Sequence, residues 1–214
     1  MSLLLERGLL FVLVIPAIVF HEVAHGWAAW RLGDPTAKTS GRLSLNPLRH
    51  IDPFGTVLLP LLLAFMGLPV IGYAKPVPID PRYFRDYRKG MLITGLAGPV
   101  TNLALATVAG VVVRTTVWMP GAAAIVPLVA YQFAMVNLVL MFFNLIPVPP
   151  LDGSRVLPVF LSDRAMRSYH RMERYGILIV FAFIWLAPRL LGFSPIEAYL
   201  SVTVDPLLRL LSGV

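Results

Sequence analysis

The sequence contains no cysteine and few charged residues, and each of these absences excludes a class of protein. Without cysteine there are no disulfide bonds and no thiolate ligands, so any metal ion must be held by histidine, aspartate or glutamate. Charged residues make up 14% of the 214 residues, hydrophobic residues make up 57%, and the mean hydropathy is +0.77. Soluble globular domains contain about 25% charged residues. The sequence therefore predicts an integral membrane protein.

Acidic residues are outnumbered by basic ones, which gives a formal net charge of +7. Such an excess can indicate nucleic-acid binding. Here, however, the basic residues lie between apolar runs, where lipid headgroups and the positive-inside rule account for them. We therefore expect the lipid bilayer as a partner and no nucleic acid. The chain is too short for a second soluble domain, so residues 1–214 are expected to form one membrane-embedded domain.

Apolar runs predict an all-α polytopic helical bundle with about four to six membrane segments. The clearest runs are residues 8–30, 91–118, 125–146 and 176–191. A capping-box pattern at residues 194–197 predicts a further helix at the end of the chain. Residues 54–71 are also apolar, but Pro60, Gly67 and Pro69 suit a re-entrant hairpin as well as they suit a crossing.

Three basic segments predict the topology. Residues 31–53, 72–90 and 153–174 carry four, five and five Lys or Arg, whereas residues 115–124 carry none. The positive-inside rule places the three basic segments together on the cytoplasmic side, with the amino terminus outside. This arrangement requires residues 54–71 to return to the side from which they start.

Two histidines and a glutamate lie within the first apolar run, in the pattern His21-Glu22-Val23-Ala24-His25. Residues four apart lie on one face of a helix, so the two imidazoles are spaced to hold one tetrahedral zinc ion. Glu22 beside them is placed to act as a base. Polar groups are costly in lipid, which favours a functional site over a polar helix end that only hydrogen-bonds to its neighbours.

A catalytic zinc site needs a third protein ligand and an open position for water. Asp152 is a candidate, because three prolines and a glycine place it directly after an apolar run. On spacing alone it could equally cap backbone amides in a turn. His50, in a loop bounded by two prolines, could instead complete a three-histidine site. We favour for His50 a role in hydrogen bonding to a metal ligand, or in contact with substrate.

Three motifs resemble the hallmarks of the site-2 protease family of intramembrane zinc metalloproteases: HEVAH at 21–25, GPVTN at 98–102 and NLIPVPPLDG at 144–153. GRLSLNPLRHIDPFGT at 41–56 and GYAKPVPID at 72–80 resemble a compact bacterial branch without PDZ or CBS domains. The resemblance implies a multi-pass zinc metalloendopeptidase in a bacterial-type inner membrane. It implies one Zn²⁺ per chain, a transmembrane protein as substrate, and Asp152 as the third ligand.

The resemblance also implies roles for residues outside the ligand set. Glu22 would take a proton from the attacking water and return it to the leaving amine. Asn102 is expected to help catalysis by donating to the oxyanion, and Asn144 to bind substrate. From the sequence alone, either asparagine is as well explained by a hydrogen bond between helices.

An intramembrane protease must bind its substrate unwound, because helical amides are already hydrogen-bonded. Residues 72–79 could offer a β-like edge near the active site, to which an extended peptide would add as a strand. Pro76 and Pro78 are two residues apart, which fits a strand with one unpaired edge. A loop stiffened by proline is an equal alternative.

Two other functions remain open on the sequence. One is a membrane metal-binding or transport protein that uses His21, His25 and Asp152 without catalysis, although such a site has no need of Glu22. The other is a membrane metalloprotease with an enclosed chamber, whose third ligand would be a late glutamate. Glu173 and Glu197 are the later glutamates, and neither lies in a ligand motif.

Overall fold

The computed structural model describes residues 3–67, 72–120 and 124–214, and within these ranges it contains helices and no strand. Four helical segments are long and apolar enough to cross a membrane: Gly8–Arg31, Tyr87–Thr116, Ile125–Asn144 and Asp163–Leu191. The expected all-α polytopic membrane protein is confirmed. The third segment ends two residues earlier than expected, at Asn144, and the fourth begins earlier, at Asp163.

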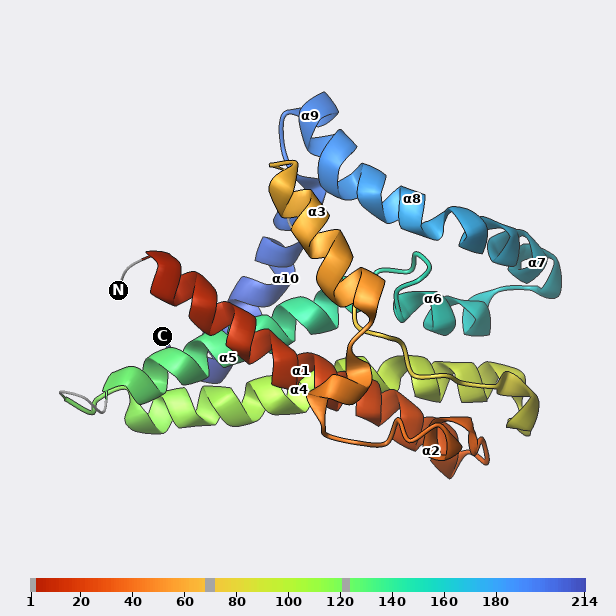
Figure 1. The fold of residues 1–214 in the computed structure, drawn as a ribbon, viewed down its shortest axis with the longest axis horizontal. Coiled ribbons are helices and arrows are strands. Elements are labelled where there is room, and N and C mark those ends of the chain that lie inside the picture. Colours follow the sequence, from red (N-terminus) through yellow and green to blue (C-terminus); the bar gives the residue numbers. More distant parts are fainter. Residues whose placement is uncertain (1–2, 68–71, 121–123) are drawn as a thin grey trace.

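Four helices form the packed part of the fold. α4 (Tyr87–Thr116) and α5 (Ile125–Asn144) run side by side in opposite directions, and α1 (Leu3–Arg31) crosses them (Figure 1). α10 (Pro195–Ser212) packs against both α4 and α5. The core that these three helices share consists of Ala106, Ala109, Ala134, Leu138, Met141, Val204 and Leu208. Three of these residues are alanine, which lets the helix backbones approach closely.

The last helix begins where the sequence predicts. The Ser194 side chain accepts a hydrogen bond from the backbone N–H of Glu197 at 3.3 Å, and Pro195 is the first helical residue. α10 is not one of the four candidate spans, because Glu197, Asp205 and Arg209 all lie within it.

Short elements connect the long helices. Between α1 and α4 lie α2 (Thr36–Thr39), η1 (Pro47–His50), η2 (Pro53–Leu58), α3 (Leu59–Phe65) and η3 (Pro81–Tyr83). After α5 come α6 (Gly153–Val156) and η5 (Leu157–Phe160). The fourth candidate span consists of α7 (Asp163–Met172), η6 (Glu173–Tyr175), α8 (Gly176–Phe181), η7 (Ala182–Leu186) and α9 (Ala187–Leu191). It lies apart from the α4–α5 pair (Figure 1), and only 6% of its most apolar stretch is buried by the rest of the protein.

The residues at the two ends of the apolar segment that contains η2 and α3 lie next to each other. The backbone N–H of Tyr73 donates to the Gly55 carbonyl at 3.0 Å, and the Thr56 hydroxyl donates to the Tyr73 carbonyl at 2.9 Å. The two ends of the segment therefore meet, as a re-entrant hairpin requires, and its helix is too short to be a candidate span. Residues 68–71, which include Pro69, lie outside the described residues.

The expectation of a β-like edge at residues 72–79 is wrong, because residues 72–80 contain no regular secondary structure. The backbone N–H groups of Tyr73, Lys75 and Val77 all donate to the protein, but their acceptors belong to η2, η1 and a side chain of α1. These acceptors are not a neighbouring strand, so no ladder forms. The alternative of a loop stiffened by proline is the one that the structure supports.

Candidate metal centre

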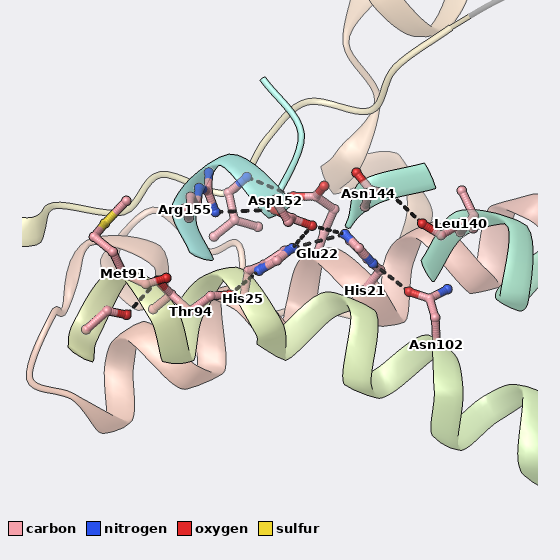
Figure 2. A network of polar contacts seen from close by, with 12 residues as sticks. His21, Glu22, His25, Met91, Thr94, Asn102, Leu140, Asn144, Asp152 and Arg155 are labelled. Carbon is pink, nitrogen blue, oxygen red and sulfur yellow. Dashed lines mark hydrogen bonds and ion pairs between the residues drawn. The ribbon is translucent and has the colours of Figure 1, made fainter. Parts of the chain in front are cut away.

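The two histidines of α1 point their Nε2 atoms at one place. His21 and His25 lie one turn apart, and these atoms are 3.0 Å from each other. On the outer side of each ring, His21 Nδ1 lies 2.5 Å from the Asn102 side-chain oxygen, and His25 Nδ1 lies 2.6 Å from the Thr94 carbonyl oxygen (Figure 2). Both outer partners are acceptors, so each Nδ1 carries the proton and each Nε2 presents a lone pair.

Asp152 brings a carboxylate oxygen to the same place. Its Oδ2 lies 3.0 Å from each of the two Nε2 atoms, although the residue is 131 positions from His21. The turn that follows α5 makes this approach possible, because Gly153 packs directly on the Leu145 carbonyl where any Cβ would overlap it. All three residues are nearly inaccessible, at 5%, 3% and 6% exposure for His21, His25 and Asp152.

The three donor atoms fit a zinc ion. Two imidazole lone pairs and a carboxylate oxygen have no proton to share among them, so they repel one another unless a cation lies between them. In a tetrahedral zinc site with bonds of about 2.0–2.1 Å, neighbouring ligand atoms lie about 3.3 Å apart, close to the spacing seen here. Acceptors on the outer nitrogens are the usual partners of metal-binding histidines. Three ligands leave a fourth position for water or substrate.

The Asn102 side chain joins His21 on α1 to Asn137 on α5. Its side-chain oxygen accepts from His21, and its amide nitrogen donates to the Asn137 side-chain oxygen at 2.9 Å. Asn137 in turn donates to the Phe133 carbonyl at 2.8 Å. Both asparagines are completely buried. Asn102 therefore orients His21 in this structure, and its expected contact with an oxyanion stays a prediction.

Glu22 follows His21 on α1, and its carboxylate is held by a segment that lies outside α1. Its Oε2 accepts a hydrogen bond of 3.0 Å from the backbone N–H of Val77. Val77 belongs to the 72–80 segment, so this contact joins two of the sequence motifs across 55 positions.

The other candidates of the sequence lie away from the three ligands. His50 is 3% exposed, and its Nε2 lies 2.8 Å from the Ser44 carbonyl oxygen, so in this structure it lies outside the cluster of potential ligands. Asn144 is half-buried at the end of α5, where its amide donates to the Leu140 carbonyl at 2.9 Å. Within the described residues, the only cluster of potential ligands is His21, His25 and Asp152, which leaves out both Glu173 and Glu197.

Sequence reasoning missed three contributors to this site. The Thr94 carbonyl and the Val77 N–H are backbone groups, which no residue pattern reveals. Asn137 had a visible signal, because it is a polar residue inside an apolar span and such residues face the protein interior. Its particular partner, Asn102, could be identified only from the packing of α4 against α5.

Gly98 is the point at which α4 approaches His21 and His25. A Cβ at this position would lie 2.5 Å from His21 Cε1, 2.5 Å from His25 Nε2 and 2.6 Å from His21 Nε2. Real Cβ atoms do not approach this closely, so glycine is required for the ligands to keep their positions.

We predict that Gly98→Ala lowers the zinc content about tenfold or more, because the added methyl group displaces both imidazoles. The measurement is metal analysis of the purified protein. Gly8→Ala is the matched control, since a Cβ there meets nothing within 4 Å. Full zinc content in the Gly98 variant would show that the contact is not tight.

Comparison with known proteins agrees with this geometry. Residues 116–187 match the model of peptidase family M50. A Bacillus subtilis protein named "Putative zinc metalloprotease YwhC" is 36% identical over 210 residues, which cover 96% of this chain and 91% of that protein. "Putative zinc metalloprotease Rip2" of Mycolicibacterium smegmatis is 31% identical over 174 residues, 79% of this chain and 65% of that protein.

More distant similarity extends to archaea. "Zinc metalloprotease MJ0392" of Methanocaldococcus jannaschii is 28% identical over 158 residues, which cover 73% of this chain and 35% of that protein. No solved structure matches the chain significantly. The near full-length similarity to the Bacillus protein shows that this chain belongs to peptidase family M50, the site-2 protease family.

Proposed function

We propose that this chain is an intramembrane zinc endopeptidase of the cell membrane, which hydrolyses peptide bonds of membrane-embedded or membrane-associated proteins. The chain forms one catalytic domain and holds one zinc ion. His21, His25 and Asp152 are its ligands, and Glu22 is its general base.

The depth of the site within the candidate spans carries the proposal. Arg31 ends the first span, and at 1.5 Å per residue His25 and His21 lie about 9 and 15 Å from it along the helix. On α4, Gly98 lies about 18 Å beyond the helix cap at Asp86 by the same rise. A metal ion held at this depth can reach a peptide bond that lies in the membrane. It cannot reach a soluble substrate that remains in water.

The chain's own residues supply the proton transfers. His21, His25 and Asp152 would hold a zinc ion, which would supply a Lewis acid to acidify water and to polarise the carbonyl of the scissile bond. The Glu22 carboxylate accepts the proton of the attacking water and passes it to the leaving amine. The Asn102 oxygen and the Thr94 carbonyl keep Nδ1 protonated on His21 and His25, so that both Nε2 atoms remain ligands. Asn102 is thus a positioning residue, and Asn144 stays a candidate for substrate binding.

A transporter or a metal store accounts less well for the same geometry. A site of either kind needs ligands, but it does not need a carboxylate beside them that is held in place by a separate segment of the chain. The observation that favours catalysis is therefore the placement of Glu22 against Val77. The direct test is comparison of membrane protein fragments in cells that express the wild type or Glu22→Gln. Fragments that appear only with the wild type support proteolysis.

We also propose that residues 31–53, 72–90 and 153–174 share the cytoplasmic side. Because the chain has no cysteine, single cysteines can report this directly. Ser40, Arg85 and Ser168 are exposed. We expect Ser40→Cys, Arg85→Cys and Ser168→Cys to resist an impermeant thiol reagent in intact cells and to react once the membrane is opened. Reaction at position 85 alone from outside would show that residues 54–71 cross.

A further inference from the structure

We propose that Pro76-Val77-Pro78 positions the general base, by directing a single backbone N–H at the carboxylate of Glu22. The inference rests on the proposed function and assigns a role to the 41–56 and 72–80 motifs, which the ligand set and the base leave unexplained. Val77 would act through Glu22 and would not touch the reacting atoms, so it is a positioning residue.

The contact is specific to one atom. Val77 lies between two prolines, which have no N–H, so it carries the only backbone donor of residues 76–78. That donor lies 3.0 Å from Glu22 Oε2. Val77 is 5% exposed, so water does not compete freely for the bond. The bond to Oε2 therefore limits the orientations that the Glu22 carboxylate can take.

Residues of the 41–56 loop hydrogen-bond to the segment that contains Val77 and hold it in place. The N–H of Lys75 donates to the His50 carbonyl at 2.9 Å. The Arg42 guanidinium donates to the carbonyls of Arg49, Lys75 and Pro76, and so joins the loop to the segment. Arg42 is only 6% exposed, although no carboxylate partner is found for it within the described residues. A buried arginine that bonds to three carbonyls serves to hold backbone in place.

The helix that carries Glu22 is shaped to receive the segment. Gly26 lies one turn beyond Glu22 on α1, and a Cβ there would be 2.9 Å from Val77 Cγ1 and 2.8 Å from Leu43 Cδ2. Glycine at this position lets Val77 approach the helix closely enough for its N–H to reach the carboxylate. The loop, the segment and the helix therefore all contribute to one hydrogen bond.

These contacts orient the base. A glutamate side chain has three rotatable bonds, and a carboxylate that samples several rotamers spends little time in line with the attacking water. Misplacement of a catalytic group by about 1 Å can cost on the order of 10²-fold in rate. A fixed N–H on one oxygen removes this freedom before substrate binds.

The test compares two substitutions at one position, in the full-length protein with its zinc. Val77→Pro removes the N–H, whereas Val77→Ala keeps the N–H and shortens the side chain. We expect Val77→Pro to lower kcat about 10- to 100-fold with KM and zinc content close to those of the wild type, and Val77→Ala to retain most of kcat. Equal loss in both variants, or loss of zinc in Val77→Pro, would overturn the proposal.

A second variant covers the case in which Val77→Pro does not fold. Replacement of Val77 by its α-hydroxy acid changes one amide to an ester and removes the N–H without adding a ring. We expect the same fall in kcat at unchanged zinc content, and wild-type kcat in this variant would refute the inference. An inactive wild-type protein would instead refute the proposed function, so the two failures are distinguishable.

Discussion

Glu22→Gln is expected to abolish peptide hydrolysis while leaving the zinc ion in place. The amide has nearly the volume of the carboxylate and can still accept from the Val77 N–H through its oxygen, so the packing around α1 is kept. It cannot take a proton from water, and the loss of a general base costs about 10²- to 10⁴-fold in rate. The ligands His21 and His25 are unchanged, so metal affinity should be close to that of the wild type.

Two measurements on the same preparation decide this prediction. Zinc content by elemental analysis should be about one equivalent in both proteins, and cleavage of a transmembrane peptide in detergent or liposomes should be seen only with the wild type. Restoration of cleavage by zinc after chelation would tie the wild-type activity to the metal. Turnover in the Gln variant near that of the wild type would rule out Glu22 as the base.

Asp152→Ala is expected to lose zinc as well as activity. Removal of the carboxylate leaves two imidazoles, and two ligands are fewer than the three that a catalytic zinc site uses. The variant also lacks the negative charge that offsets the charge of the cation in a buried site. We expect zinc content well below half an equivalent after dialysis, and no measurable cleavage.

His50→Ala is the control for this variant, because it removes a buried imidazole that lies outside the ligand cluster. Loss of its bond to the Ser44 carbonyl should lower stability somewhat while zinc stays largely bound. If His50→Ala lost zinc and Asp152→Ala kept it, the third ligand would be His50 and the arrangement at Asp152 would have to be abandoned. Circular dichroism of both variants would separate metal loss from unfolding.

The placement of His21 and His25 can be predicted from the sequence pattern, whereas that of Asp152 cannot. The placement of His21 and His25 on one face follows from helical periodicity alone, because residues four apart always lie on the same side. The position of Asp152 does not follow from periodicity, since it depends on how far the turn after α5 folds back over α4. The motif resemblance pointed to Asp152, and the glycine contacts explain how the backbone reaches the histidines.

The 72–80 segment shows a choice that sequence reasoning left open. Two prolines at alternate positions are compatible with an edge strand and with a stiff loop, because either conformation tolerates a missing N–H. The choice depends on what lies beside the segment. The neighbours are a helical turn, a 3₁₀ turn and a glutamate side chain, so the donors are satisfied one at a time and no ladder forms.

The sequence by itself determined that this protein is helical and lies in a membrane, where three of its four candidate spans begin and end to within a few residues, and that His21 and His25 share one face of a helix. These properties follow from composition, from runs long enough to cross lipid, and from spacing along one helix. Only the tertiary structure decided that Asn102 orients His21, that His50 supports a loop, and that Val77 reaches Glu22. Each of these depends on hydrogen bonds between segments far apart in the chain, and such bonds are set by packing, which no local pattern encodes.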